Sequence, residues 1–266
     1  MQEIIPPDFP HEIHAFSPLF FALGHLPPHR ARHGFFGGIV STFVSRGCLA
    51  IGRKKNLAQR VTIIKTAYQL FVEEGYENVT TKQVADTCGM AHSLLHYYYP
   101  TKSDLLTDII NTMIAKLHSY IAAEGVDLMD RLYVYGLFNR LFFESVSVNR
   151  KLLGIYQAAL TDGDVLRRWT KYAVDKFALL PADATEKAKL APYILSGSMG
   201  QILPLYAETE IHLELRETVN LALDVFYSVN SLTKAWIHAT VGLIDRRMTQ
   251  PFIRGFLTEF SDMMRT

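Results

Sequence analysis

Apolar residues recur at helical spacing over the first well-patterned part of the chain. Leu57, Val61, Ile64, Tyr68 and Phe71 follow one another at intervals of four, three, four and three, which places them on one face of an α-helix. The pattern stops before a glycine, a residue that readily adopts the left-handed conformation of a helix end. The sequence therefore predicts an amphipathic helix that begins at Leu57.

Two shorter helices are expected next. Thr80 begins one of them, because its hydroxyl can accept from the backbone of Gln83 while the Gln83 side chain returns to Thr80, as in a capping box. Gly89 can take a positive φ and break the chain, and a third helix, over residues 92–99, stops before a proline. Thr101 then opens a fourth helix. Short helices joined by a tight glycine turn are typical of a helix-turn-helix DNA reader.

The remainder of the chain also has helical periodicity, and no alternating strand pattern stands out. We therefore predict an all-α fold, with a three-helix DNA-binding domain at residues 53–102 and a larger helical domain at 103–266. The further helices are expected at residues 103–123, 127–147, 150–160, 163–180, 184–207, 212–247 and 251–265.

Composition and charge narrow the class of protein. Of the 266 residues, 49% are hydrophobic and 20% are charged, which is typical of a globular protein. The net charge is +1, but residues 53–102 hold seven basic and four acidic side chains, so a basic segment suited to DNA is attached to a mildly acidic body. Cys48 and Cys88 have neither disulfide-scaffold nor zinc-site spacing, and we expect a reducing, cytoplasmic location.

The first 52 residues differ in composition from the rest. They hold six of the eleven prolines and five of the ten histidines, and they show no regular period. Their apolar runs, at 18–23 and 35–44, are shorter than the ~20 residues of a membrane-spanning helix. We expect a poorly ordered extension or a start assigned too far upstream, dispensable for folding and without a membrane anchor.

No local motif of an enzyme stands out. The patterns GxSxG and HExxH and a phosphate-binding glycine loop are absent, so we expect no catalytic residue and no cofactor. His92 and His96 are spaced for one helical face, but no third ligand lies near them in the sequence. We therefore expect no metal site.

A series of landmark residues occurs in order between positions 67 and 102. They are Ala67-Tyr68-Gln69-Leu70-Phe71, Glu74-Gly75-Tyr76, Thr80-Thr81, Val84-Ala85, Gly89-Met90 and Leu95-His96-Tyr97-Tyr98-Tyr99-Pro100-Thr101-Lys102. This series resembles the N-terminal domain of the tetracycline-repressor (TetR) family of transcription regulators. The resemblance covers residues 53–102, whereas the rest of the chain fits the family only in length and helical character.

The resemblance implies DNA contacts for ten residues. Thr81, Lys82 and Lys102 would meet phosphates, and the first turn of the third helix would face base edges in the major groove. His96 and Tyr98 would approach the DNA backbone, and a basic arm before the first helix would reach the DNA. The ten residues are Lys54, Lys55, Thr81, Lys82, His92, Ser93, Leu94, His96, Tyr98 and Lys102.

Two positions depart from the family pattern. Ala91 stands where a Ser-type N-cap is usual, so the recognition helix lacks a cap worth about 1 kcal/mol. His96 replaces the common tyrosine and brings a charge that depends on pH. We expect Met90, Leu95 and Tyr99 to lock the three-helix core instead of facing DNA.

The larger domain is rich in aromatic residues, and the resemblance implies a small-molecule pocket inside it. Most of the rings should belong to the core, while some should line a cavity with polar contacts from Arg140, Glu144 and Gln157. The candidates for binding a small apolar or aromatic effector are Tyr135, Phe138, Asn139, Phe142, Tyr156, Trp169 and Tyr172.

The sequence thus favours a DNA-binding transcription regulator, a ligand-responsive repressor that binds a palindromic operator as a homodimer. A dimer is expected because one short recognition helix reads only a few base pairs. The apolar residues of 221–244 and 252–264 are the expected dimer surface. The alternative, from a different class, is a small-molecule-binding helical protein without a DNA function.

Overall fold

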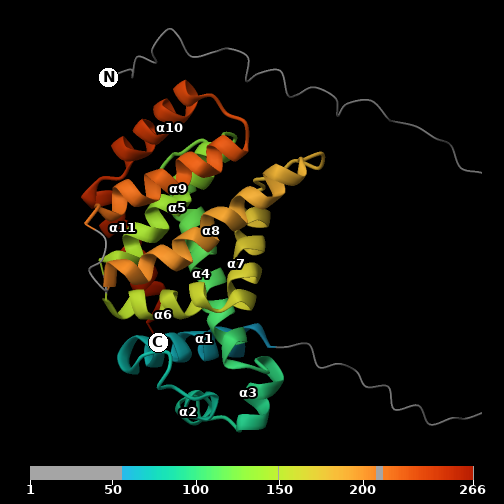
Figure 1. The fold of residues 1–266 in the computed structure, drawn as a ribbon. Helices are drawn as coiled ribbons and strands as arrows, with labels where there is room; N and C mark the ends of the chain where they lie inside the picture. The colour runs from blue at the N-terminus through green and yellow to red at the C-terminus, as the bar shows by residue number, and fades with distance from the viewer. Residues whose placement is uncertain (1–55, 149, 208–211, 266) are drawn as a thin grey trace, which may run out of the picture. The chain divides into compact units, whose positions relative to one another are not determined.

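The computed structural model describes residues 56–148, 150–207 and 212–265 (Figure 1). The expectations for residues 1–52 and for the arm at Lys54 and Lys55 lie outside the described residues. Within the described ranges the secondary structure is helical and contains no strand, which confirms the all-α class. No helix there has both the length and the apolar character needed to span a membrane.

The helices are separated by short connections that contain the glycine, proline and polar breaks of the sequence. In chain order they are α1 (Leu57–Glu74), α2 (Thr81–Thr87), α3 (His92–Tyr98), α4 (Lys102–Ala123), α5 (Arg131–Ser147), α6 (Arg150–Thr161), α7 (Gly163–Lys176), α8 (Glu186–Ala207), α9 (Leu215–Val229), α10 (Lys234–Arg247) and α11 (Gln250–Met264).

The first three helices share a small core. The Asn56 side chain caps α1, and Gly75 at its end has φ 89°, a conformation that L side chains rarely adopt. This turn brings α2 back onto α1. Phe71, Val84 and Leu95, one from each helix, are all at most 1% exposed, so each helix has a fixed inner face.

The capping box lies at a different helix from the one predicted. Thr80 accepts from the Gln83 N–H at 3.1 Å as expected, but the Gln83 side chain donates to the Glu74 carboxylate at 2.8 Å. An ionised acceptor makes the stronger hydrogen bond. The reciprocal pair forms at α4, where Thr101 accepts from the Asp104 N–H and the Asp104 carboxylate accepts from the Thr101 N–H.

Three predicted helices are too long. The one predicted at 212–247 is two helices, α9 and α10, because Ser231 takes φ 63° between them and Thr233 caps the second. Asp130 caps α5, which begins at residue 131 instead of 127. Ala178 has φ 46° just beyond the end of α7, at residue 176. Side-chain bonds to backbone N–H groups thus start α5 and α10, whereas residues with positive φ follow the ends of α7 and α9.

Helix α4 belongs to both parts of the fold. It runs from the three-helix unit into the helical body (Figure 1) and contacts α1, α5, α6, α7 and α11. Its inner residues Ile110, Met113 and Leu117 are fully buried. A displacement of α4 would therefore change contacts both in the helical body and in the unit formed by α1, α2 and α3.

Aromatic rings fill the centre of the body. The Phe142 ring centroid lies 5.1 Å from Tyr156 and 5.0 Å from Trp169, and the Phe138 centroid lies 4.5 Å from Phe177. These separations are those of directly packed aromatic pairs. The rings join α5, α6 and α7 into one core.

A buried charge links α5 to α9 and α10. Arg140 is fully buried, pairs with Glu144, donates to Asn220 Oδ1 at 2.6 Å and lies 3.3 Å from an Asp245 oxygen. A buried guanidinium needs such partners, because its desolvation is costly. Arg140 and Glu144, expected as polar contacts of a pocket, therefore hold three helices together.

The close packing of α5 predicts the effect of one added methyl group. A Cβ at Gly136 would lie 1.9 Å from the Tyr227 hydroxyl oxygen and 2.9 Å from Ile244 Cδ1. We expect Gly136→Ala to lower the free energy of unfolding by about 1–3 kcal/mol in urea denaturation, because the neighbours must move.

The matched control is Gly154→Ala in α6, where no heavy atom lies within 4 Å of the new Cβ. That variant should keep its stability or gain up to about 1 kcal/mol from helix propensity. Equal stabilities for the two variants would contradict the packing of α5 on α9 and α10.

Candidate nucleic-acid interface

The outer face of α3 carries the residues predicted to read bases. His92, Ser93 and Leu94 are exposed in its first turn, and His96 is exposed one turn further on. Leu95 is fully buried on the opposite side. Since the helix repeats about every 3.6 residues, the burial of Leu95 turns the other four side chains outward.

The start of α2 lies beside this face. Thr81 Oγ1 and His92 Nε2 are 3.1 Å apart, so the first turns of α2 and α3 are in contact. Lys82 follows with an exposed side chain. A hydroxyl and an ammonium group in this position are suitable donors to phosphate oxygens.

The inner side of α3 agrees with the sequence. No side chain caps the helix at Ala91. Tyr99 is 3% exposed, and Met90 is half-buried against the hydrophobic core. The expected core role of these residues and of Leu95 is thus confirmed.

Tyr98 faces α1 instead of solvent, contrary to its expected place on the DNA side. It is 8% exposed. Its hydroxyl accepts from the Asn56 N–H and donates to Gln59 Oε1, both at 3.1 Å. Since three successive helical residues point in different directions, Tyr97 becomes the exposed one, and Tyr98 stabilises the start of α1.

Lys102 also has internal partners that the sequence does not indicate. Its Nζ donates to the carbonyl oxygens of Tyr76 at 2.6 Å, Val79 at 3.0 Å and Glu77 at 3.4 Å, and it lies 4.1 Å from the Tyr76 ring centroid. Burial lowers the pKa of Lys102. An ammonium group has three donors, so in this geometry none is left for a phosphate.

A polar cluster joins α1 and α4 through Tyr99, the residue that follows α3. The Asp108 carboxylate accepts from the Tyr99 hydroxyl at 2.6 Å and pairs with Arg60 at 2.6 Å. Burial, together with the neighbouring carboxylate, raises the pKa of Tyr99. No sequence pattern predicts this cluster, because Arg60 and Asp108 are 48 residues apart.

The first turn of α4 is bonded to α7. Ser103 Oγ donates to Asp162 at 2.9 Å, and Arg168 pairs with Asp104 at 2.7 Å. Burial would raise the pKa of Asp104, but hydrogen bonds from Thr101 and Arg168 hold it below its ordinary value. The turn that carries Lys102 is therefore connected to the body by polar contacts.

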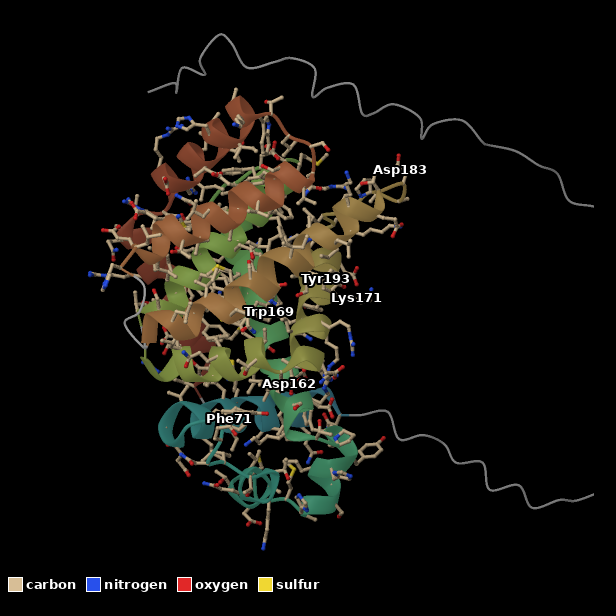
Figure 2. All side chains as sticks on the ribbon, viewed as in Figure 1. Phe71, Asp162, Trp169, Lys171, Asp183 and Tyr193 are labelled. Carbon is tan, nitrogen blue, oxygen red and sulfur yellow. The ribbon has the colours of Figure 1, made fainter. Side chains whose placement is uncertain are left out.

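The seven residues predicted to bind an effector come together as packed core. Six are at most 4% exposed, and Tyr172 is half-buried; Figure 2 shows Trp169 inside the body. The Asn139 amide donates to the Tyr135 carbonyl at 2.8 Å. None of the seven lines either of the two cavities described next.

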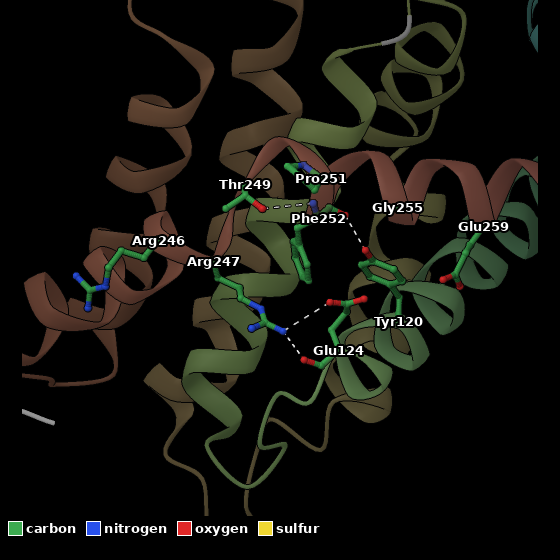
Figure 3. Close-up of a pocket in the computed structure, with 9 residues that line it drawn as sticks. All are labelled: Tyr120, Glu124, Arg246, Arg247, Thr249, Pro251, Phe252, Gly255 and Glu259. Carbon is green, nitrogen blue, oxygen red and sulfur yellow. Dashed lines mark hydrogen bonds and ion pairs between the residues drawn. The ribbon is translucent and has the colours of Figure 1, made fainter. Parts of the chain in front are cut away.

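Two cavities open along α11. One, of about 460 Å³, lies where α4 and α10 end and α11 begins, and it is lined by Tyr120, Arg247 and Phe252 among others (Figure 3). The other, of about 380 Å³, lies between α1, α4 and the end of α11, beside Leu57 and Met263. The sequence indicates neither, because each combines residues more than 100 positions apart.

No group of three or more His, Cys, Asp or Glu side chains is placed to hold a metal ion within the described ranges. The His92 and His96 rings lie 6.5 Å apart. They face outward with the rest of the α3 surface. The geometry of this surface therefore suits contacts to nucleic acid better than metal coordination.

Part of the expected dimer surface is wrong. Phe252, Phe256 and Phe260 of α11 are at most 6% exposed, because this helix packs on α1, α4 and α5 of its own chain. Large apolar side chains are exposed on α8 and, within the expected range 221–244, on α9; these two helices pack side by side. This α8–α9 surface comprises Leu190, Tyr193, Ile194, Leu221 and Val225, each 39–58% exposed.

Comparison with known families and proteins gives a match over the helices that carry the exposed α3 face. The family model described as bacterial regulatory proteins, tetR family, matches residues 63–109, from within α1 into α4. An HTH-type transcriptional regulator of Staphylococcus aureus is 29% identical over 118 residues, 40% of this chain. The match spans 63% of that relative, less than two thirds of its length.

Solved structures with a similar arrangement include two bacterial regulators. A TetR transcriptional regulator from Rhodococcus sp. RHA1 has a TM-score of 0.47 and 16% identity, over 66% of this chain and 97% of its own. SmeT, the repressor of the Stenotrophomonas maltophilia multidrug efflux pump SmeDEF, has a TM-score of 0.43 and 18% identity, over 64% and 88%.

The family match and the geometry concern the same residues. The matched segment contains the Thr81–His92 contact, the exposed first turn of α3 and the buried Leu95. The order of landmarks in the sequence and the three-helix core agree with it. Over residues 63–109 the chain is thus similar to the TetR family of bacterial regulatory proteins.

Proposed function

We propose that the chain regulates transcription by binding duplex DNA through α2 and α3. The observation that carries this proposal is the exposed first turn of α3, whose opposite side is fixed by buried Leu95. A helix held in this way can enter a major groove and present its side chains to base edges. The family match supports the same reading.

In this proposal the first turn of α3 reads bases, and its surroundings contact the DNA backbone. Thr81 and Lys82 donate to phosphates, and His96 lies one turn from the base-reading residues on the exposed side of α3. Lys54 and Lys55 form the basic arm that the sequence suggests. Their positive charge adds affinity without sequence preference.

The proposed regulator is a homodimer formed through the α8–α9 surface. Exposed apolar side chains gathered on two adjacent helices are costly in water, and a second copy offers a matching surface. Two recognition helices related by a two-fold axis would read a palindromic operator.

We further propose that a ligand weakens DNA binding, so that the protein is a ligand-responsive repressor. The contacts of Ser103 and Asp104 with α7 support this, because they connect the body to the turn that carries Lys102. The α3 helices of the two copies must enter major grooves about 34 Å apart. A small tilt of α4 in each copy would therefore misalign the two α3 helices.

The first test separates phosphate contacts from internal ones. DNA from the promoter region beside the gene is titrated at several salt concentrations and followed by fluorescence anisotropy. Lys82→Ala should weaken binding to all DNA and reduce the slope of log affinity against log salt by about one.

Lys102→Met provides the comparison. It should lower the free energy of unfolding by about 1–3 kcal/mol, because the loop carbonyls lose their donor, and leave the salt slope of the remaining folded protein unchanged. If Lys102→Met reduced the slope of log affinity against log salt, Lys102 would be a phosphate contact after all. No binding of the wild-type chain to promoter DNA would contradict the proposed function.

A base-reading role of Ser93 predicts a change of preference. Operators with single base changes in each half-site are compared for the wild type and for Ser93→Ala. The variant should alter the order of preference by about 1–3 kcal/mol at one base pair. Loss of affinity that is uniform over all operators would show that Ser93 contacts only the backbone.

The dimer surface is tested by adding a charge. Leu221→Glu should shift the molar mass in light scattering from dimer to monomer, since an isolated carboxylate is costly to bury in an apolar interface. Met129→Glu, at a position 80% exposed in the loop before α5, should keep the dimer. A monomeric wild type, or a dimeric Leu221→Glu protein, would refute this surface.

A further inference from the structure

The cavity between α4, α10 and α11 combines an apolar wall with an incompletely bonded cation. We propose that it binds a small ligand with one carboxylate and a compact apolar body. This site lies outside the aromatic core of α5, α6 and α7. Its regulatory consequence rests on the proposed function, whereas the binding itself does not.

The cavity has the size and the wall of a ligand site. Its volume is about 460 Å³, within the range of roughly 300–1,000 Å³ for such sites. Tyr120, Pro251 and Phe252 supply apolar surface (Figure 3). The Tyr120 hydroxyl donates to the Phe252 carbonyl at 2.8 Å, and a Cβ at Gly255 would lie 2.5 Å from that hydroxyl oxygen, so the wall depends on glycine there.

Arg247 supplies donors at this wall. Its Nη2 donates to the Glu124 carbonyl oxygen and lies 3.8 Å from the Glu124 carboxylate (Figure 3). Its guanidinium lies 5.3 Å from the Phe252 ring centroid, while the buried Nε has no acceptor. A guanidinium has five N–H donors in a planar fork that matches a carboxylate. A carboxylate at this point would satisfy the buried Nε.

The charges around the cavity favour a single negative group. Glu259 is already paired with Lys116, and Glu124 is the acidic partner of Arg247. Arg246 also lines the cavity and has no ion pair with any residue in the described ranges. The lining holds two arginines and two glutamates. Because Lys116, outside the lining, neutralises Glu259, the two arginines are left with one acidic partner, Glu124, and this local imbalance attracts an anion.

The second cavity differs in how its two cations, Arg60 and Lys65, are bonded. Its Arg60 is bonded to Asp108 at 2.6 Å, and its Lys65 donates to the Arg265 carbonyl at 2.8 Å. Both cations there have close oxygen partners. An anionic ligand would have to displace these partners, so we assign the carboxylate to the α4–α10–α11 cavity.

A ligand in this cavity would act on two helices that reach α1. Helix α11 begins beside the cavity and ends near α1, where the Phe260 and Tyr68 ring centroids are 5.6 Å apart. Helix α4 ends at the Glu124 carbonyl that Arg247 holds. A carboxylate that competes for Arg247 would loosen this end of α4, and we expect a change in DNA affinity.

The binding test uses defined probes on the full chain. Isothermal titration compares 3-phenylpropanoate and octanoate with their neutral amides. At least one carboxylate should bind about tenfold or more tightly than its amide, because the amide cannot form the charge-assisted pair. If neither carboxylate shows this preference, the proposal is overturned.

Three variants locate the site. Arg247→Gln should remove the preference for the carboxylate, and Arg254→Gln, an equal charge change at an exposed position of α11, should keep it. Glu124→Gln should tighten carboxylate binding several-fold, because the competing acid is gone, and a misfolded protein cannot produce such a gain. Unchanged affinities in Arg247→Gln and Glu124→Gln would place the binding elsewhere and refute the site.

DNA release is measured separately. The carboxylate probe that binds in the titration is added to the protein–promoter complex and should lower its DNA affinity. By linkage, the DNA should lower the affinity for that carboxylate by the same factor. A protein that binds the probe through Arg247 and never binds DNA would contradict the proposed function while supporting the site. Equal DNA affinity with and without the probe would overturn only the regulatory consequence.

Discussion

The ammonium group of Lys102 holds three carbonyl groups of the loop between α1 and α2, and the position of α2 and α3 depends on this contact. The loop cannot shift relative to α4 unless these hydrogen bonds are lost. In the next two positions, Ser103 and Asp104 are bonded to α7. The first turn of α4 thus carries the contacts to the α1–α2 loop and to α7. Because of these contacts, α4 connects the first three helices to the helical body rigidly.

The sequence predicts the local features of this arrangement well. Thr80, Gly89 and Thr101 mark helix boundaries through bonds and conformations within three or four residues, and the structure has those boundaries. The exposed side of α3 follows from the burial of Leu95. The direction of Lys102 was not predictable, because its acceptors lie more than twenty residues earlier, and helical periodicity says nothing about such partners.

For the helical body, by contrast, the sequence predicts which residues are present but not how they pack. Its aromatic content is evident in the sequence, but whether rings enclose a space or fill it depends on how three helices interlock. Here Phe142 meets Tyr156 and Trp169 at packing distance, and the two cavities lie along α11 instead. The role of Arg140 differs from the expected one for a similar reason: besides Glu144 on its own helix, its partners Arg216 and Asn220 lie 76 and 80 residues away.

The placement of the two tryptophans has a spectroscopic consequence. Trp169 is 3% exposed and packs in the aromatic core, whereas Trp236 makes an edge-to-face contact with Tyr227 of α9. The chain contains no other tryptophan. Replacing Trp236 by phenylalanine would therefore leave Trp169 as the one tryptophan, in α7 against Phe142 of α5, and its emission would report on how tightly those two helices remain packed.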